Sequence, residues 1–99
     1  MNNLRLLDEA QNEFEEALFF YLEKDKSTAN RFVTAFELAT TRIRTSPLSG
    51  SIYSEIYRFQ KLKGFPYLII YRADNDEYLA VTVKHTSLDD SYWQWRDAR

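Results

Sequence analysis

The chain lacks the residues on which several kinds of functional site depend. Its 99 residues include no cysteine, one histidine, two glycines and two prolines. Without cysteine the sequence excludes a disulfide framework, a thiolate zinc site and a thiol nucleophile. The glycines Gly50 and Gly64 stand alone, so no glycine-rich phosphate loop is present. One histidine offers too few ligands for a usual metal centre, and no serine lies in a nucleophile-elbow motif. We therefore expect no cofactor, no metal and no serine-hydrolase chemistry.

Long apolar runs are also missing. The longest uncharged apolar stretch covers residues 65–71, far short of the roughly 20 residues that a membrane-spanning helix needs. The first five residues contain none of the apolar region of a secretory signal. These features predict a cytoplasmic protein with no membrane partner.

Aromatic side chains, by contrast, are abundant. Seven Phe, seven Tyr and two Trp supply the large side chains that a domain of this size needs to bury enough surface. No repeat, low-complexity tract or linker interrupts the chain. We expect one domain over residues 1–99, with a core rich in aromatic rings.

Charge is distributed unevenly. The net charge is −2, but residues 8–25 hold seven acids and one base, whereas residues 57–73 hold four bases and no acid. On opposite sides of a fold, these segments would steer one face towards an anionic partner. Alternatively, these residues are ordinary solvated charges on a helix and on strands. The sequence does not decide between the two interpretations.

The first half of the chain predicts a short strand and two helices. Residues 4–7 are long enough only for a strand, and Asp8 with Gln11 forms a capping-box pattern for a helix beginning near Glu9. Ser27 is the expected cap of the second helix. Apolar residues recur at helical spacing in both, namely Phe14, Ala17, Leu18, Tyr21, Phe32, Val33, Phe36, Ala39, Thr40 and Ile43.

The second half predicts strands. Residues 46–51 form an exit loop, and residues 52–62, 65–72 and 77–85 are rich in β-branched and aromatic residues. Residues 67–71 are apolar on both faces, so they should form a central strand with the helices on one side. The fold class is α+β: an N-terminal strand, a two-helix hairpin, a three-stranded antiparallel meander and a short docked segment over residues 87–99.

One set of polar residues on the strands and the C-terminal segment has the chemistry of an endoribonuclease. Cations can hold a phosphate and stabilise a phosphoryl transition state while a histidine or tyrosine moves protons. Tyr92 and Trp93 can stack on RNA bases. Equally, the lysines can be solvated, His85 can end a strand as a packed residue, and Trp93 can close the core. The candidate set is Arg58, Lys61, Lys63, His85, Tyr92 and Arg96.

Three segments resemble the RelE/ParE toxin superfamily, and most closely the ParE-like branch known as plasmid-stabilisation proteins. They are residues 65–71 (FPYLIIY), residues 79–85 (LAVTVKH) and residues 91–93 (SYW). The helical half fits as well, and the resemblance covers essentially the whole chain. It implies the α+β fold described above and a bacterial, cytoplasmic toxin of a type II toxin–antitoxin pair.

The resemblance also implies partners. A cognate antitoxin would wrap the toxin with a segment that orders on binding. The implied target is DNA gyrase in the ParE branch and mRNA in the ribosomal A site in the RelE branch. Whether the toxin forms a homodimer or a toxin–antitoxin heterotetramer stays open.

Individual residue positions distinguish the RelE branch from the ParE branch. Lys61 and Tyr92 match ribonuclease positions, but the second-strand arginine is replaced by Leu68, and the arginine after His85 is missing from residues 86–88. Losing one preorganised donor costs about 100–1000-fold in rate. Arg58 keeps a first-strand arginine of the ParE branch, whereas residues 88–90 (LDD) replace its usual later arginines. We therefore expect a toxin that binds gyrase, with a ribosome-dependent ribonuclease (Arg58, Lys61, His85 and Tyr92 catalytic) or a degenerate antitoxin-binding member as alternatives.

Partner contacts are expected on two surfaces. Exposed members of the aromatic set Phe19, Phe20, Tyr57 and Phe59 would anchor the antitoxin in an apolar groove, unless all four belong to the core. Target or antitoxin contacts are also expected at Arg58, Lys61, Lys63, Trp93 and Arg96.

Overall fold

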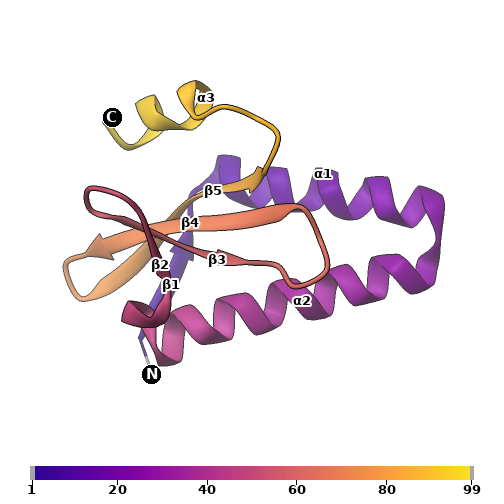
Figure 1. The fold of residues 1–99 in the computed structure, drawn as a ribbon, viewed down its shortest axis with the longest axis horizontal. Coiled ribbons are helices and arrows are strands. Elements are labelled where there is room, and N and C mark those ends of the chain that lie inside the picture. The colour runs from indigo at the N-terminus through magenta and orange to yellow at the C-terminus, as the bar shows by residue number, and fades with distance from the viewer. Residues whose placement is uncertain (1, 99) are drawn as a thin grey trace.

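The computed structural model describes residues 2–98 and confirms the α+β class (Figure 1). In chain order the elements are β1 (Asn3–Leu6), α1 (Asp8–Lys24), α2 (Lys26–Thr45), a 3-10 turn (Pro47–Ser49), β2 (Ser51–Ser54), β3 (Tyr57–Lys61), β4 (Tyr67–Asp74), β5 (Glu77–His85), α3 (Ser91–Gln94) and a second 3-10 turn (Trp95–Ala98).

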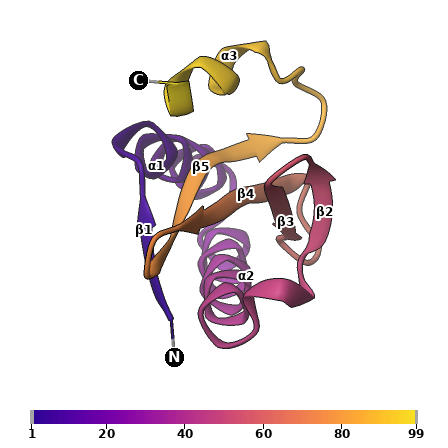
Figure 2. The ribbon, with the colours of Figure 1, turned by 90° about the vertical axis from the view of Figure 1, so that its left-hand side faces the viewer.

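The strands form one sheet in the order β1-β5-β4-β3-β2. β1 pairs with β5 in parallel, and the other neighbours are antiparallel. β4 is the central strand, as its doubly apolar sequence predicts. The two helices pack on one face, and the C-terminal segment, residues 86–98, crosses the other (Figures 1 and 2).

The strand expected over residues 52–62 is two strands. β2 and β3 form a hairpin around Glu55, which has the left-handed φ of 48°. The sequence conceals this turn because it contains no glycine or asparagine, and because its neighbour Ile56 is apolar yet 65% exposed. The meander therefore has four antiparallel strands rather than three.

Both expected helix caps are wrong. α1 begins at Asp8 itself, because Leu7 occupies the cap position directly after β1 and accepts a hydrogen bond from the Gln11 N–H (3.0 Å). α2 is capped by Asp25, whose carboxylate accepts from the N–H groups of Ser27 and Thr28 (3.3 and 3.2 Å). The Thr28 hydroxyl also donates to this carboxylate and lowers the pKa of Asp25.

Two cores lie on the two sides of the sheet. The first, between helices and sheet, buries Phe32, Ile43 and Ile69, with the ring of Phe65 edge-on to Phe32 at 5.2 Å. The second lies under the C-terminal segment and buries Ile70, Leu79, Val81 and Trp93. The aromatic-rich core is thus confirmed, and the C-terminal segment is part of the folded unit. No helix within residues 2–98 is both long and apolar enough to cross a membrane.

Candidate functional site

Arg58 lies on the helix-facing side of β3. Its neighbours Tyr57 and Phe59 pack into the second core, and side chains alternate along a strand, so Arg58 points the other way. Its guanidinium donates to the carbonyl oxygens of Gly50 (2.8 Å) and Leu48 (3.3 Å). Arg58 therefore ties β3 to the loop that follows α2.

Lys61 points to the opposite face of β3 from Arg58. Its Nζ donates to the carbonyl oxygen of Phe65 (2.9 Å), across the turn that joins β3 to β4. The side chain is exposed. Strand alternation thus separates the two cations proposed for phosphate binding.

His85 ends β5 and packs against β4. Its ring meets the ring of Tyr67 edge-on at 5.1 Å, and its Nδ1 accepts from the backbone N–H of Ser87 (3.1 Å). The Ser87 hydroxyl lies 2.8 Å from the same nitrogen. His85 therefore has the contacts of a residue that ends a strand and starts a turn.

Tyr92 lies on α3 beside β5. Its hydroxyl is 3.4 Å from Thr82 Oγ1, and the guanidinium of Arg96 lies over its ring at 5.2 Å. Burial raises the pKa of Tyr92 above its ordinary value. The phenol therefore keeps its proton at neutral pH, which suits a hydrogen-bond donor better than a general base.

His85 and Tyr92 border a common hollow between α1 and the C-terminal segment. It has a volume of about 420 Å³, and Phe20 forms part of its wall. The carboxylates Glu13 and Glu16 also line it. The hollow is therefore suited to apolar or cationic groups and not to phosphate.

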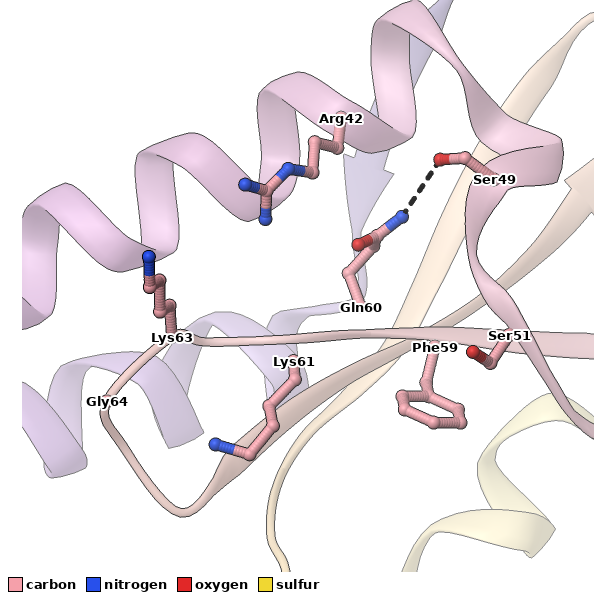
Figure 3. A pocket seen from close by; sticks show the side chains of 8 residues that line it. All are labelled: Arg42, Ser49, Ser51, Phe59, Gln60, Lys61, Lys63 and Gly64. Carbon is pink, nitrogen blue, oxygen red and sulfur yellow. Dashed lines mark hydrogen bonds between the residues drawn. The ribbon is translucent and has the colours of Figure 1, made fainter.

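A second hollow, of about 380 Å³, lies between α2 and β3 and is basic. Arg42 from α2 and Lys63 from the β3–β4 turn extend towards each other across it (Figure 3). Lys61 lines it from the far side of β3, and Gln60 is held in place by its amide, which donates to Ser49 Oγ (3.3 Å). This hollow concentrates the positive charge that the sequence predicts for this region.

The four aromatic residues proposed as antitoxin anchors fall into two groups. Phe19 and Phe20 on α1 are 63% and 51% exposed. Tyr57 and Phe59 are half-buried in the second core, where the Tyr57 ring meets Trp93 at 5.1 Å. The structure therefore leaves an open aromatic surface on α1 and covers the one on β3.

Trp93 closes the second core and is 1% exposed. Its Nε1 donates to Asp90 Oδ1 (2.9 Å), which also accepts from the Tyr53 hydroxyl (2.7 Å). The buried Lys84 places its Nζ 3.7 Å from the same oxygen. Burial, with the hydrogen bond to Asp90, raises the pKa of Tyr53 to about 12. Trp93 thus serves packing in this conformation rather than a partner surface.

A second carboxylate, Asp97, anchors the end of the C-terminal segment. Its two oxygens accept from Nε and Nη2 of Arg72 (2.6 and 2.7 Å), and Oδ2 also accepts from the Tyr57 hydroxyl. The hydrogen bond from Arg72 holds the pKa of Asp97 below its ordinary value. Arg72 also lies 3.5 Å from Asp74, so this member of the basic segment is neutralised by pairing.

Glu13 is the third carboxylate of this kind, and it lies on α1 within the acidic stretch of residues 8–25. Arg96 donates to both of its oxygens at 3.0 Å, and Thr82 Oγ1 and the Val83 N–H donate to Oε1 (2.8 and 3.1 Å). Helical periodicity could not identify this position, because its partners come from β5 and from a segment 83 residues away.

No group of His, Cys, Asp and Glu side chains in residues 2–98 is arranged to hold a metal ion. The carboxylates Glu13, Asp90 and Asp97 lie in separate places, and each is engaged by arginine, lysine, tyrosine or tryptophan side chains. Their role in the described part of the chain is to attach the C-terminal segment.

Known proteins supply independent evidence for the family. The model of the family described as the ParE toxin of the type II toxin–antitoxin system parDE matches residues 4–89. No protein with a curated description matches. A solved structure of a chromosomal ParDE toxin–antitoxin system from P. aeruginosa matches with a TM-score of 0.74 at 13% identity, covering 88% of this chain and 98% of that chain. Identity this low shows a common fold, whereas the family match spans most of the sequence. The chain therefore belongs to the family of ParE toxins of type II toxin–antitoxin systems.

Proposed function

We propose that this ParE toxin acts by binding DNA gyrase in the bacterial cytoplasm, without chemistry of its own, and that a cognate antitoxin neutralises it. The observation that carries the proposal is the separation of the candidate catalytic groups. A ribonuclease needs its cations and its proton-transfer groups around one phosphate.

In this chain the two kinds of group lie apart. His85 and Tyr92 share their hollow with the carboxylates Glu13 and Glu16. Arg58 and Lys61 lie on β3, which β4 separates from β5. Two strand spacings amount to about 10 Å, and the two cations also point to opposite faces of β3. This arrangement supports inhibition by binding over RNA cleavage.

A gyrase supercoiling assay tests this function. We expect the purified protein to inhibit supercoiling of relaxed plasmid at micromolar concentration. The double variant His85→Gln, Tyr92→Phe should inhibit within about twofold of the wild type, because it removes proton transfer but keeps the side-chain volumes. Cleavage of mRNA on programmed ribosomes is measured on the same two proteins.

Two results would count against the proposal. One is cleavage of mRNA by the wild type that the double variant loses by about 100-fold or more, as expected when general acid–base groups are removed. The other is an absence of both gyrase inhibition and growth arrest when the chain is produced alone, which would favour a degenerate member.

The exposed aromatic pair on α1 is the proposed antitoxin anchor. Phe20 lies between this open surface and the hollow next to Tyr92, and apolar rings in such positions dominate binding energies. Phe20→Asp should weaken antitoxin binding by about tenfold or more, measured by calorimetry with the co-expressed partner separated and refolded.

Ile56→Asp is the matched control for Phe20→Asp. Ile56 is also exposed and apolar, but it lies in the β2–β3 turn, distant in the chain from α1. The control should bind the antitoxin as the wild type does. Equal affinity of the wild type and Phe20→Asp, with the thermal midpoint of Phe20→Asp unchanged, would remove Phe20 from the interface.

A further inference from the structure

Three hollows on the α2 side of the molecule adjoin one another at Lys63. The first is the basic hollow between α2 and β3, the second lies beside the β3–β4 turn (about 430 Å³), and the third lies along α2 (about 380 Å³). Lys63 lines all three, Arg42 lines the first, and Arg31 lines the other two. No aspartate or glutamate is among the described residues that line them. We call Arg31, Arg42 and Lys63 the basic strip.

The α2 helix holds the two arginines of the basic strip on one face. Arg31 and Arg42 are eleven residues apart, which is about three helical turns, so they lie about 16 Å apart along the helix axis. Lys63 extends towards Arg42 from the β3–β4 turn (Figure 3). Arg31 donates to Thr28 Oγ1 (3.1 Å), and none of the ion pairs found within residues 2–98 involves these three cations. Their charge is therefore available to an external anion.

Uncharged hydrogen-bonding side chains line the same hollows. They are Ser27, Asn30, Thr34, Ser49, Ser51 and Gln60. Hydroxyl and amide groups of this kind, together with arginine and lysine, make most protein contacts to DNA phosphates. A length of about 16 Å corresponds to about five base-pair steps of a duplex, each of which advances about 3.4 Å. The basic strip thus matches the backbone of a duplex in both chemistry and length.

We propose that the basic strip contacts the phosphate backbone of duplex DNA, and that this DNA is the segment that gyrase holds while the toxin inhibits it. The inference rests on the proposed function, because gyrase acts on DNA and therefore places a polyanion beside the bound toxin. A chain with a net charge of −2 binds DNA weakly on its own. Within a complex with gyrase, the high effective concentration of the DNA makes the weak contact significant.

The observations favour a duplex backbone over single-stranded RNA. Single strands are held largely by stacking of their bases on open aromatic rings. The rings that line the three hollows are packed instead: Phe59 meets Tyr53 edge-on at 5.9 Å, and Phe65, which is 9% exposed, meets Tyr21 edge-on at 5.1 Å. A flexible acidic peptide fits less well, because it loses conformational entropy on binding, whereas a short duplex is already stiff.

Fluorescence anisotropy with a labelled duplex of about 20 base pairs tests the basic strip on the full chain. Three phosphate contacts predict a slope of about −2.7 when the logarithm of the binding constant is plotted against the logarithm of the salt concentration. The single variants Arg31→Gln, Arg42→Gln and Lys63→Gln should each change this slope to about −1.8, because each removes one contact. Thermal unfolding verifies that each variant remains folded.

Arg5→Gln is the matched control for the three single variants. It removes the same charge from an exposed side chain on β1, which lies at the opposite edge of the sheet from β2 and β3. We expect the affinity of Arg5→Gln for the duplex and its salt dependence to equal those of the wild type.

The supercoiling assay connects the basic strip to gyrase. The combined variant Arg31→Gln, Arg42→Gln, Lys63→Gln should need a concentration at least about threefold higher than the wild type for half-maximal inhibition, because it loses the contact with DNA. The difference should decrease as salt is added and screens the remaining charge contacts of the wild type. Arg5→Gln should again behave as the wild type does.

The outcomes separate this inference from the proposed function. A wild type that does not inhibit gyrase contradicts the proposed function, whereas the predicted salt slopes still support the strip as a DNA contact. Equal slopes for the wild type and the three single variants overturn the inference. So does equal gyrase inhibition by the wild type and the combined variant. Tighter binding of single-stranded RNA, or of a peptide of alternating Glu and Val, than of the duplex also overturns it.

Discussion

Replacing Gly50 with alanine is expected to destabilise the fold by about 3 kcal/mol, through overpacking and one lost hydrogen bond. Gly50 has an ordinary extended backbone (φ −65°, ψ 144°), so it is not required for its conformational freedom. It is required for space. A Cβ here would collide with the hydroxyl of Tyr71 and lie 2.9 Å from the Phe59 carbonyl oxygen.

The displaced hydroxyl has a structural function of its own. The Tyr71 OH donates to the carbonyl of Pro47 (2.5 Å), and Arg58 donates to the Gly50 carbonyl, so a shift in this loop breaks contacts on both sides. We expect the thermal midpoint of Gly50→Ala to fall by roughly 10–25 °C for a domain of this size.

Tyr71→Phe provides the internal control for Gly50→Ala. Removing the hydroxyl takes away the nearest clash, although the Phe59 carbonyl remains close. The double variant should therefore lose less stability than the sum of the two single variants, as urea unfolding of all four proteins measures. Strict additivity would show that the alanine Cβ does not meet Tyr71.

Replacing Asp97 with asparagine is the second change with a large expected effect. Asp97 accepts two hydrogen bonds from Arg72 and one from Tyr57, and its side chain is 9% exposed. Bonds to a charged partner contribute about 1.5–3 kcal/mol, and the variant leaves the Arg72 guanidinium without its counter-charge. A loss of about 2–3 kcal/mol is expected, with partial release of the C-terminal segment.

The same carboxylate predicts a pH dependence. Its pKa is lower in the folded chain than in the unfolded chain, so the unfolded state binds more protons around that pKa. The stability from Asp97 is therefore fully present above its ordinary pKa of 3.8 and is lost as the pH falls through the lower folded value. The free energy of unfolding of the wild type should therefore decrease as the pH falls through this range, and that of Asp97→Asn should decrease less.

Release of the segment has a direct optical readout. Trp93 belongs to this segment and is buried against the sheet, so Asp97→Asn should shift tryptophan emission to longer wavelength and increase acrylamide quenching. Glu77→Gln is a suitable control, because Glu77 pairs only loosely with Arg5 on the surface (3.6 Å). Unchanged stability and quenching in Asp97→Asn would show that the Arg72 pair is not what holds the segment.

The helices and the central strand could be predicted from the sequence because their signals are local. The apolar spacing around Phe32 and Ile43 matches their burial, and the doubly apolar run at Ile69 and Ile70 lies at the centre of the sheet. Caps and short turns were predicted less well. Asp8 and Asp25 both carry capping side chains, but Asp8 lies inside α1 because Leu7 takes the cap position directly after β1, whereas Asp25 lies between the two helices and caps α2.

The candidate site residues show the same division between what local sequence predicts and what the path of the chain determines. The residue types were evident from the sequence. Side chains alternate along a strand, however, so Arg58 and Lys61 lie on opposite faces of β3. β2 begins only at Ser51, after the 3-10 turn of residues 47–49, and therefore leaves the β3 edge beside Lys61 without a strand. Glu13, a residue of an acidic helix in the sequence, is half-buried because Arg96 reaches it from the C-terminal segment.

The sequence alone determined the α+β class, the cysteine-free and aromatic-rich core, the uneven charge and the resemblance to ParE toxins, because these follow from composition and short-range order. The tertiary structure decided which charges are free and which are paired. Arg72 and Arg96 bind carboxylates far away in the chain, whereas Arg42 and Lys63 border an open hollow. Pairing of this kind depends on distance in space, which a list of residues does not specify until the sheet and the C-terminal segment are assembled.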